Sequence, residues 1–201
     1  MDISIVNKIS KDKYQSLLDM IHSSFEEYHD IGIDFSCSHY SMDDLREKVL
    51  SKWYFIALDD CENIAGVTAF FPINRKDCYE SITAISPKYK GFGIGSKLMQ
   101  ARKTFLRERH YKRVISDTAA QAKPSVDWHL KKCGCCIMGY KSYENTGYYS
   151  YLFCEHIEGK INLFFRFAYF NRFIISFLLT RLLVKKNGQR TFFGLLIHKG
   201  K

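Results

Sequence analysis

The sequence lacks several patterns that would assign it to a familiar class. Its first residues contain no basic segment followed by a long apolar run, which is the pattern of a secretory signal. Its seven cysteines are an odd number, and no two pairs of them have the spacing of zinc ligands. We therefore expect a reducing, cytoplasmic compartment, cysteines that are mostly buried as small apolar residues, and no metal site.

Acidic residues are absent from the last part of the chain. Residues 1–158 contain 21 Lys and Arg and 21 Asp and Glu, whereas residues 159–201 contain 9 basic residues and no acidic residue. The formal net charge of +9 therefore comes from one segment and does not spread over the chain. We expect a domain of residues 1–157 without a nucleic-acid partner, followed by a basic, aromatic extension of residues 158–201.

The extension is rich in aromatic residues and interrupted by arginines. Residues 163–184 are long enough to span a bilayer, but Arg166, Arg172 and Arg181 would each cost roughly 2.5–3.5 kcal/mol near its centre. A helical wheel gathers the basic and polar residues on one half, which predicts a basic amphipathic helix. Three interpretations remain open: packing on its own domain or in a homodimer, peripheral contact of residues 160–184 with an anionic membrane, and binding of nucleic acid or an acidic partner.

The hydrophobic pattern predicts a mixed α/β domain. Helical spacing of apolar residues predicts helices after Ser10, after Ser41, over residues 96–110 and from Pro124 to Gly134. Apolar runs predict strands at residues 3–9, 53–58, 64–71, 79–85, 113–117, 135–143 and 148–154. The resulting order is β-α-α-β-β-β-α-β-α-β-β.

The most informative segment joins a strand to a helix. The apolar run of residues 81–85 ends at Ser86, and the loop Lys90-Gly-Phe-Gly-Ile-Gly95 leads into the helix predicted from Ser96. Glycines allow backbone N–H groups to converge, and a helix N-terminus carries about half a positive charge, so this geometry suits an anion. The glycine spacing fits neither the dinucleotide-binding pattern G-x-G-x-x-G nor the P-loop pattern G-x-x-x-x-G-K-S/T.

This segment resembles the pyrophosphate loop of the GNAT family of N-acetyltransferases, whose pattern is Q/R-x-x-G-x-G/A. Residues 90–95 match it with Lys90 at the first position, and the flanking strand and helix match almost position for position. The order of elements over residues 1–156 is also that of this family. The resemblance implies an α+β fold with a mostly antiparallel, twisted sheet flanked by helices. It also implies acetyl-CoA as the acyl donor and no metal.

The resemblance assigns roles along the segment. Backbone groups of Ala84, Ile85 and Ser86 would pair with the pantetheine amides of acetyl-CoA, in the manner of one more strand. The pyrophosphate would be held by Lys90, Gly91, Phe92, Gly93, Ile94, Gly95 and Ser96. Lysine stands where Gln or Arg is usual, and it keeps the charge but loses the planar guanidinium of Arg.

Acyl transfer to an amine needs a base for the amine and benefits from an acid for the leaving thiolate. Many relatives use a Glu on the strand before the glycine loop, and Glu80 is the only acidic residue on this strand. Glu80 shares a face with Ile85 only if a β-bulge intervenes, and a solvated Glu at a strand end is the alternative. Leu130 stands where the family usually has a Tyr whose hydroxyl lies near the sulfur and acts as the acid. We therefore take Tyr140, in the hairpin predicted over residues 135–154, as the candidate acid.

Other side chains stay in consideration. His22, His29 and His39 lie on the segment that lines the acceptor pocket in the family, although each also fits an ordinary surface histidine. Tyr143 and Tyr148 are alternatives to Tyr140. The cluster of cysteines at residues 133–136 has no matched base or second ligand pair nearby, so we expect buried cysteines at a helix end.

These features predict an acyl-CoA-dependent N-acyltransferase. The expected reaction transfers acetyl from acetyl-CoA to a primary amine of a small molecule, for which an amino sugar is one choice. The alternatives are acetylation of a protein or peptide amine, and a catalytically impaired CoA-binding module. Residues 26–40, which would line the acceptor site, carry no signature that separates these alternatives.

Overall fold

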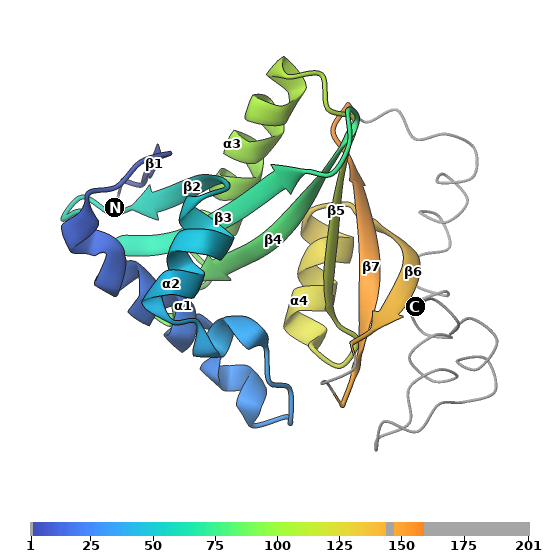
Figure 1. The fold of residues 1–201 in the computed structure, drawn as a ribbon, viewed down its shortest axis with the longest axis horizontal. Helices are drawn as coiled ribbons and strands as arrows, with labels where there is room; N and C mark the ends of the chain where they lie inside the picture. Colours follow the sequence, from blue (N-terminus) through green and yellow to red (C-terminus); the bar gives the residue numbers. More distant parts are fainter. Residues whose placement is uncertain (1, 144–146, 159–201) are drawn as a thin grey trace. The chain divides into compact units, whose positions relative to one another are not determined.

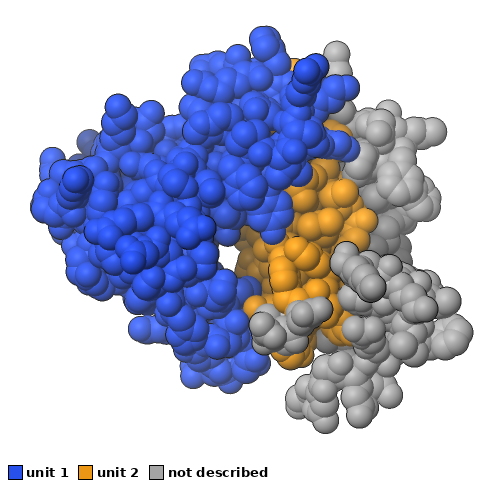
Figure 2. Space-filling model, viewed as in Figure 1, with its two compact units in different colours: residues 1–114 blue, residues 115–201 orange. Residues whose placement is uncertain are grey.

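The structure is a computed structural model that describes residues 2–143 and 147–158. The chain divides into two compact units, residues 1–114 and residues 115–201 (Figure 2). The first unit contains β1 (Ser4–Val6), α1 (Tyr14–His29), α2 (Met42–Leu45), β2 (Trp53–Leu58), β3 (Ile64–Pro72), β4 (Asp77–Ile85) and α3 (Ile94–Glu108). Strand β5 (Arg113–Ala119) begins at the end of this unit, and the second unit continues with α4 (Lys123–Asp127), β6 (Cys136–Ser142) and β7 (Tyr149–His156).

The strands of the described residues form a seven-stranded sheet in the order β1-β2-β3-β4-β5-β7-β6. The pairs β1–β2, β2–β3, β3–β4 and β6–β7 are antiparallel. Helices and strands follow one another in the predicted order, so the predicted fold class is confirmed (Figure 1).

Strands β2–β4 of the first unit pack on both of their faces, because successive side chains point to opposite faces and many on each face are apolar. Helices α1 and α2 cover one face, where the core contains Leu17, Ile21, Leu45, Val49, Ile56, Val67, Ala69, Ile82 and Ala84. Helix α3 covers the opposite face, where Ile94 and Leu98 pack on Ala57 and Ala65. Trp53, Phe55, Phe70 and Phe105 extend this second core with ring centroids 5.1–6.0 Å apart. The core therefore fixes α3 relative to β4, which matters for the site.

Two helix starts test local predictions. The helix predicted after Ser41 begins with a capping box, because the Ser41 side chain accepts the Asp44 N–H and the Asp44 carboxylate accepts the Ser41 N–H. The helix predicted after Ser10 is present, but a short 3-10 turn follows Ser10, α1 begins only at Tyr14, and the Ser10 side chain does not cap either element. The Ser10 hydroxyl bonds the carboxylate of Asp12 instead, which lowers the pKa of that carboxyl.

Six of the seven cysteines are buried and all seven are free thiols, as expected from the sequence; Cys61 is the exposed one. No helix within residues 2–143 and 147–158 is long and apolar enough to cross a bilayer. The amphipathic helix predicted within residues 160–184 lies outside the described residues.

Candidate active site

The predicted connection of strand, loop and helix is present between β4 and α3. Strand β4 ends at Ile85, a 3-10 turn follows, and α3 begins two residues earlier than the sequence indicates, at Ile94. The Lys97 N–H donates to the Gly93 carbonyl at 3.1 Å, which is the first bond of the helix. No side chain caps α3, and the N–H groups of residues 94–96 precede the helical ladder. The helix start therefore presents N–H groups to an anion.

Two glycines of the loop have backbone conformations that other residues rarely adopt. Gly91 has a φ of 85° and Gly93, which precedes α3, has a φ of 75°. A Cβ built at either position would meet no heavy atom within 4 Å. Glycine is therefore required by the backbone and not by crowding, and the space beside both residues is open to a ligand.

The loop is anchored by Tyr89, which the sequence analysis did not single out. Tyr89 is buried in the core under α3, and its hydroxyl donates to Asp59 Oδ2 at 2.5 Å. Hydrogen bonds from Asn63 and Tyr89 hold the pKa of Asp59 well below its usual range. The hydrogen bond between Tyr89 and Asp59 also raises the pKa of Tyr89. The turn between β2 and β3 thus holds the glycine loop in place.

Gly66 of β3 is a second residue that the sequence analysis missed. A Cβ at Gly66 would lie 2.8 Å from Ile85 Cδ1, 2.9 Å from the Ala84 carbonyl oxygen and 3.2 Å from Ile94 Cγ2. The absence of a side chain lets the end of β4 and the start of α3 approach β3 closely. A glycine inside an apolar strand run is the signal that could have found it.

The residues predicted to pair with pantetheine lie at the end of β4. Ala84 pairs with Val67 and Ile85 pairs with Gly66 in the antiparallel ladder. The Ser86 N–H donates to the Ala65 carbonyl at 3.0 Å, and the Ser86 carbonyl accepts the Tyr89 N–H at 2.8 Å. Both backbone groups of Ser86 therefore have partners within the chain, so a ligand amide would have to share the Ser86 carbonyl.

Charged and apolar side chains surround the open loop. Lys90 Nζ lies 2.6 Å from Glu27 Oε2 of α1, and both side chains are about half exposed. Lys97 is exposed on the first turn of α3, and Phe92 is 62% exposed. An anion at the loop would therefore compete with Glu27 for Lys90.

We expect Glu27→Gln to tighten binding of acetyl-CoA several-fold, because the substitution frees Lys90 and removes a carboxylate near a polyanionic ligand. Calorimetric titration at low salt measures the change. The neighbouring Glu26→Gln is the matched control and should leave the affinity unchanged. If Glu27→Gln in a Lys90→Gln background gives the same gain, the Lys90 ion pair is not its cause.

Glu80 lies on the face of β4 that packs against α3. The β3–β4 register shifts here, since Ala69 pairs with Ile82 and Phe70 pairs with Glu80, which leaves Ser81 as an extra residue. This bulge places Glu80 on the same face as Thr83, whose hydroxyl donates to Glu80 Oε1. The β-bulge that Glu80 needs in order to share a face with Ile85 is therefore present.

The partner of Glu80 is Arg102 of α3. Arg102 donates to Glu80 Oε2, and the side chains are 3% and 10% exposed for Arg102 and Glu80. A guanidinium in contact stabilises the ionised carboxylate, which opposes the protonation that a general base undergoes. The contacts therefore favour a positioning role, in which Glu80 ties α3 to β4.

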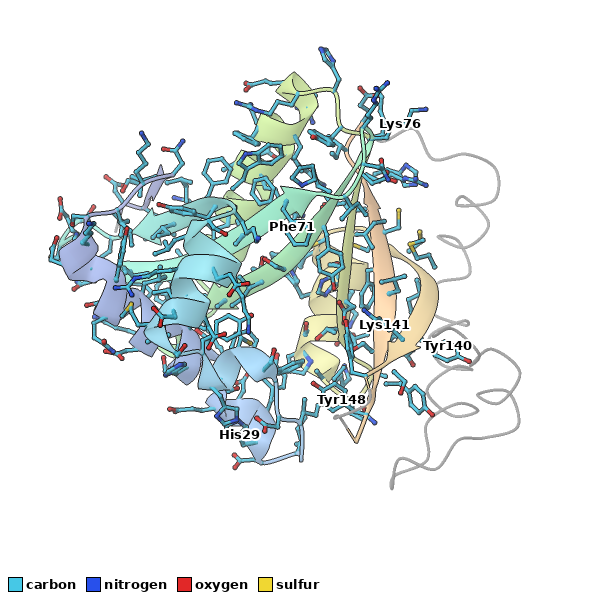
Figure 3. All side chains as sticks on the ribbon, in the orientation of Figure 1. His29, Phe71, Lys76, Tyr140, Lys141 and Tyr148 are labelled. Atoms are coloured by element: carbon cyan, nitrogen blue, oxygen red, sulfur yellow. The ribbon has the colours of Figure 1, made fainter. Side chains whose placement is uncertain are left out.

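Tyr140 lies in the second unit, in the middle of β6. Tyr140 is labelled in Figure 3. It pairs with Tyr151 of β7, and its ring stands edge-on to Tyr149 with centroids 6.0 Å apart. Burial, and then the neighbouring Tyr149, raise the pKa of Tyr140. Its hydroxyl therefore stays protonated through neutral pH. Leu130, which replaces the usual Tyr of the family, is 2% exposed within the core.

The order of helices and strands and the glycine loop before α3 are those expected from the sequence, and comparison with known proteins identifies the family. The model of the acetyltransferase (GNAT) family matches residues 15–135, which is more than half of the chain. The chain therefore belongs to the GNAT acetyltransferase family. No curated protein sequence matches it.

Solved structures of acetyltransferases share the fold. A GNAT acetyltransferase from Staphylococcus aureus Mu50 is 13% identical with a TM-score of 0.62, and the match covers 78% of this chain and 99% of that one. The PaiA N-acetyltransferase from Thermoplasma acidophilum, in complex with coenzyme A, is 15% identical with the same TM-score and coverage. The NatC complex bound to Gag peptide and CoA contains a chain that is 16% identical, with a TM-score of 0.61 and coverage of 78% and 99%.

Proposed function

We propose that this protein transfers an acetyl group from acetyl-CoA to a primary amine of a small molecule, and that residues 1–157 form the catalytic domain. The observation that carries the proposal is the open loop with Gly91 and Gly93 at positive φ before an uncapped helix. The complex of the PaiA enzyme with coenzyme A supports the donor. The peptide-bound NatC complex keeps a peptide amine as the alternative acceptor.

The chain's own residues would divide the binding of the donor among themselves. The N–H groups at the start of α3, with Lys90 and Lys97, would hold the pyrophosphate. The backbone of Ala84 and Ile85 would pair with the pantetheine amides, and Ser86 would end that pairing where the chain turns. When bound, acetyl-CoA supplies a thioester carbonyl that an amine can attack, with the thiolate as the leaving group.

We assign the proton that the leaving thiolate takes up to the hydroxyl of Tyr140. A tyrosine hydroxyl is protonated at neutral pH, and burial raises the pKa of Tyr140 further, so this hydroxyl has a proton to donate there. Glu80 is proposed to act through Arg102 by holding α3, and not to touch the amine. The proton that the amine loses passes to water, and water returns a proton to Tyr140 after each turnover. A catalytically impaired CoA-binding module is the rival function, because Leu130 replaces the usual Tyr.

We expect Tyr140→Phe to lower kcat by about 10²-fold or more while the affinity for acetyl-CoA stays the same, because only the donated proton is lost. The rate of the unmodified protein should fall as pH rises above the raised pKa of Tyr140, since deprotonation removes the acid. The pH–rate profile of the variant should not show this fall. Initial rates from pH 6 to 11 measure both effects. An unchanged kcat would exclude Tyr140 as the acid.

Release of free thiol from acetyl-CoA over a panel of amines tests the function as a whole. The panel contains amino sugars, polyamines and short peptides with free N-termini or lysines. Turnover with small amines and not with peptides supports the proposal, and the reverse result supports the peptide alternative. Calorimetric binding of acetyl-CoA without turnover of any amine would identify a CoA-binding module.

A further inference from the structure

Two imidazoles and one carboxylate meet beyond the C-terminal end of α1, away from the glycine loop in sequence. His39 Nε2 lies 2.7 Å from Asp34 Oδ1, and His29 Nε2 lies 3.4 Å from the same oxygen. The two imidazole rings stack, with centroids 5.9 Å apart and planes 10° apart. One ligand atom from each of the three residues lies within 4.8 Å of the other two. This is a group of metal-ligating side chains on a short surface segment.

The backbone that carries these side chains is held independently of them. His29 is the last residue of α1, and the chain then turns through Gly32, whose φ is 73°. The N–H groups of Ile31 and Ile33 donate to the Tyr28 carbonyl, at 3.2 Å and 3.0 Å. Ile33 is 2% exposed. The turn is therefore preorganised without any ligand.

An aromatic cluster fixes the rest of the segment. The Phe35 ring stands edge-on to Phe25 and Tyr28, with centroids 5.4 Å and 5.1 Å apart. Phe35 lies next to Asp34 in sequence and immediately precedes the 3-10 turn Ser36–His39 that ends at His39. The packing thus positions two of the three ligands, while all three side chains remain exposed to solvent.

We propose that His29, Asp34 and His39 form a binding site for a divalent transition-metal ion, with Zn²⁺ as the best fit. Two imidazole nitrogens and a carboxylate oxygen are ligands that Zn²⁺, Co²⁺ and Ni²⁺ accept, whereas Mg²⁺ and Ca²⁺ prefer oxygen ligands. Bonds of about 2.1 Å in a tetrahedron place the ligand atoms about 3.4 Å apart. The separation of His29 from Asp34 already has this value, and His39 would move outward from its hydrogen bond.

This proposal differs from the sequence-based expectation of no metal, and it does not depend on the transferase activity. Three protein ligands leave a fourth tetrahedral position for water or another ligand. A bound ion would tie the end of α1 to the 3-10 turn and close the loop between them. The segment of residues 29–39 would therefore become more resistant to unfolding and proteolysis when metal is present.

Titration of the metal-free full-length protein with Co²⁺ and with Zn²⁺ tests the site. We expect one equivalent of Co²⁺ to give the visible absorption of a tetrahedral ion without a thiolate charge-transfer band, and Zn²⁺ to displace it. Asp34→Asn and His39→Gln should each weaken the affinity at least tenfold. Asp30→Asn makes the same chemical change four residues away and should bind like the unmodified protein.

Three results would overturn the proposal. The first is an absence of binding at micromolar protein and metal, and the second is an affinity that neither variant changes. The third is a thiolate band that Cys61→Ser removes, since Cys61 is the exposed cysteine. Circular dichroism of each variant is the control, because it will show whether a loss of affinity comes from unfolding.

Discussion

Replacing Gly93 with aspartate is expected to reduce the affinity for acetyl-CoA by at least about 100-fold, which corresponds to about 2.7 kcal/mol. Two effects add. Gly93 has a φ of 75°, a left-handed conformation that costs an L residue roughly 1–2 kcal/mol. The new carboxylate would also stand at the start of α3, where the pyrophosphate is proposed to bind, and would repel it.

Gly93→Asn separates these two effects. Asparagine has nearly the shape of aspartate, carries no charge and tolerates the left-handed region better than most residues. We expect it to retain affinity within several-fold of the unmodified protein in calorimetric titrations. Equal losses in both variants would mean that backbone strain alone disrupts the loop. Full affinity in Gly93→Asp would exclude this helix start as the pyrophosphate site.

Arg102→Met is expected to have the largest effect on stability, lowering the free energy of unfolding by about 3–5 kcal/mol. Arg102 and Glu80 are 3% and 10% exposed, so removal of the guanidinium leaves a buried carboxylate without its counter-charge. Urea denaturation followed by circular dichroism measures the change. Arg107→Met is the control, because Arg107 is an exposed arginine on the same helix and should change stability little.

The double variant Glu80→Leu with Arg102→Met should recover most of the lost stability, because an apolar pair needs no counter-charge. This variant also tests the role of Glu80. If Glu80 only positions α3, the folded double variant should keep most of the kcat and of the affinity for acetyl-CoA of the unmodified protein. If it binds acetyl-CoA normally but has lost about 10²-fold or more in kcat, Glu80 acts in the chemistry as a base. A double variant as unstable as Arg102→Met would mean that the ion pair is not the source of the loss.

Features that depend only on neighbouring residues could be predicted from the sequence. The glycine loop could be recognised because its residues are contiguous and glycine is the residue that tolerates positive φ, which Gly91 and Gly93 both show. The capping box of Ser41 and Asp44 spans three residues and follows from local hydrogen bonding. Apolar runs predicted β2, β3 and β4 to within two residues at each end.

Tertiary structure alone decided which distant residues became partners. No local pattern pairs Glu80 with Arg102, because the contact depends on the bulge at Ser81 and on the packing of α3 across the sheet. The need for glycine at position 66 appears only when Ala84 and Ile85 lie against it. His29, Asp34 and His39 likewise look like separate surface residues until the turn and its aromatic packing bring them together. Backbone propensity acts over a few residues, whereas register and side-chain packing bring together atoms that lie far apart in the sequence.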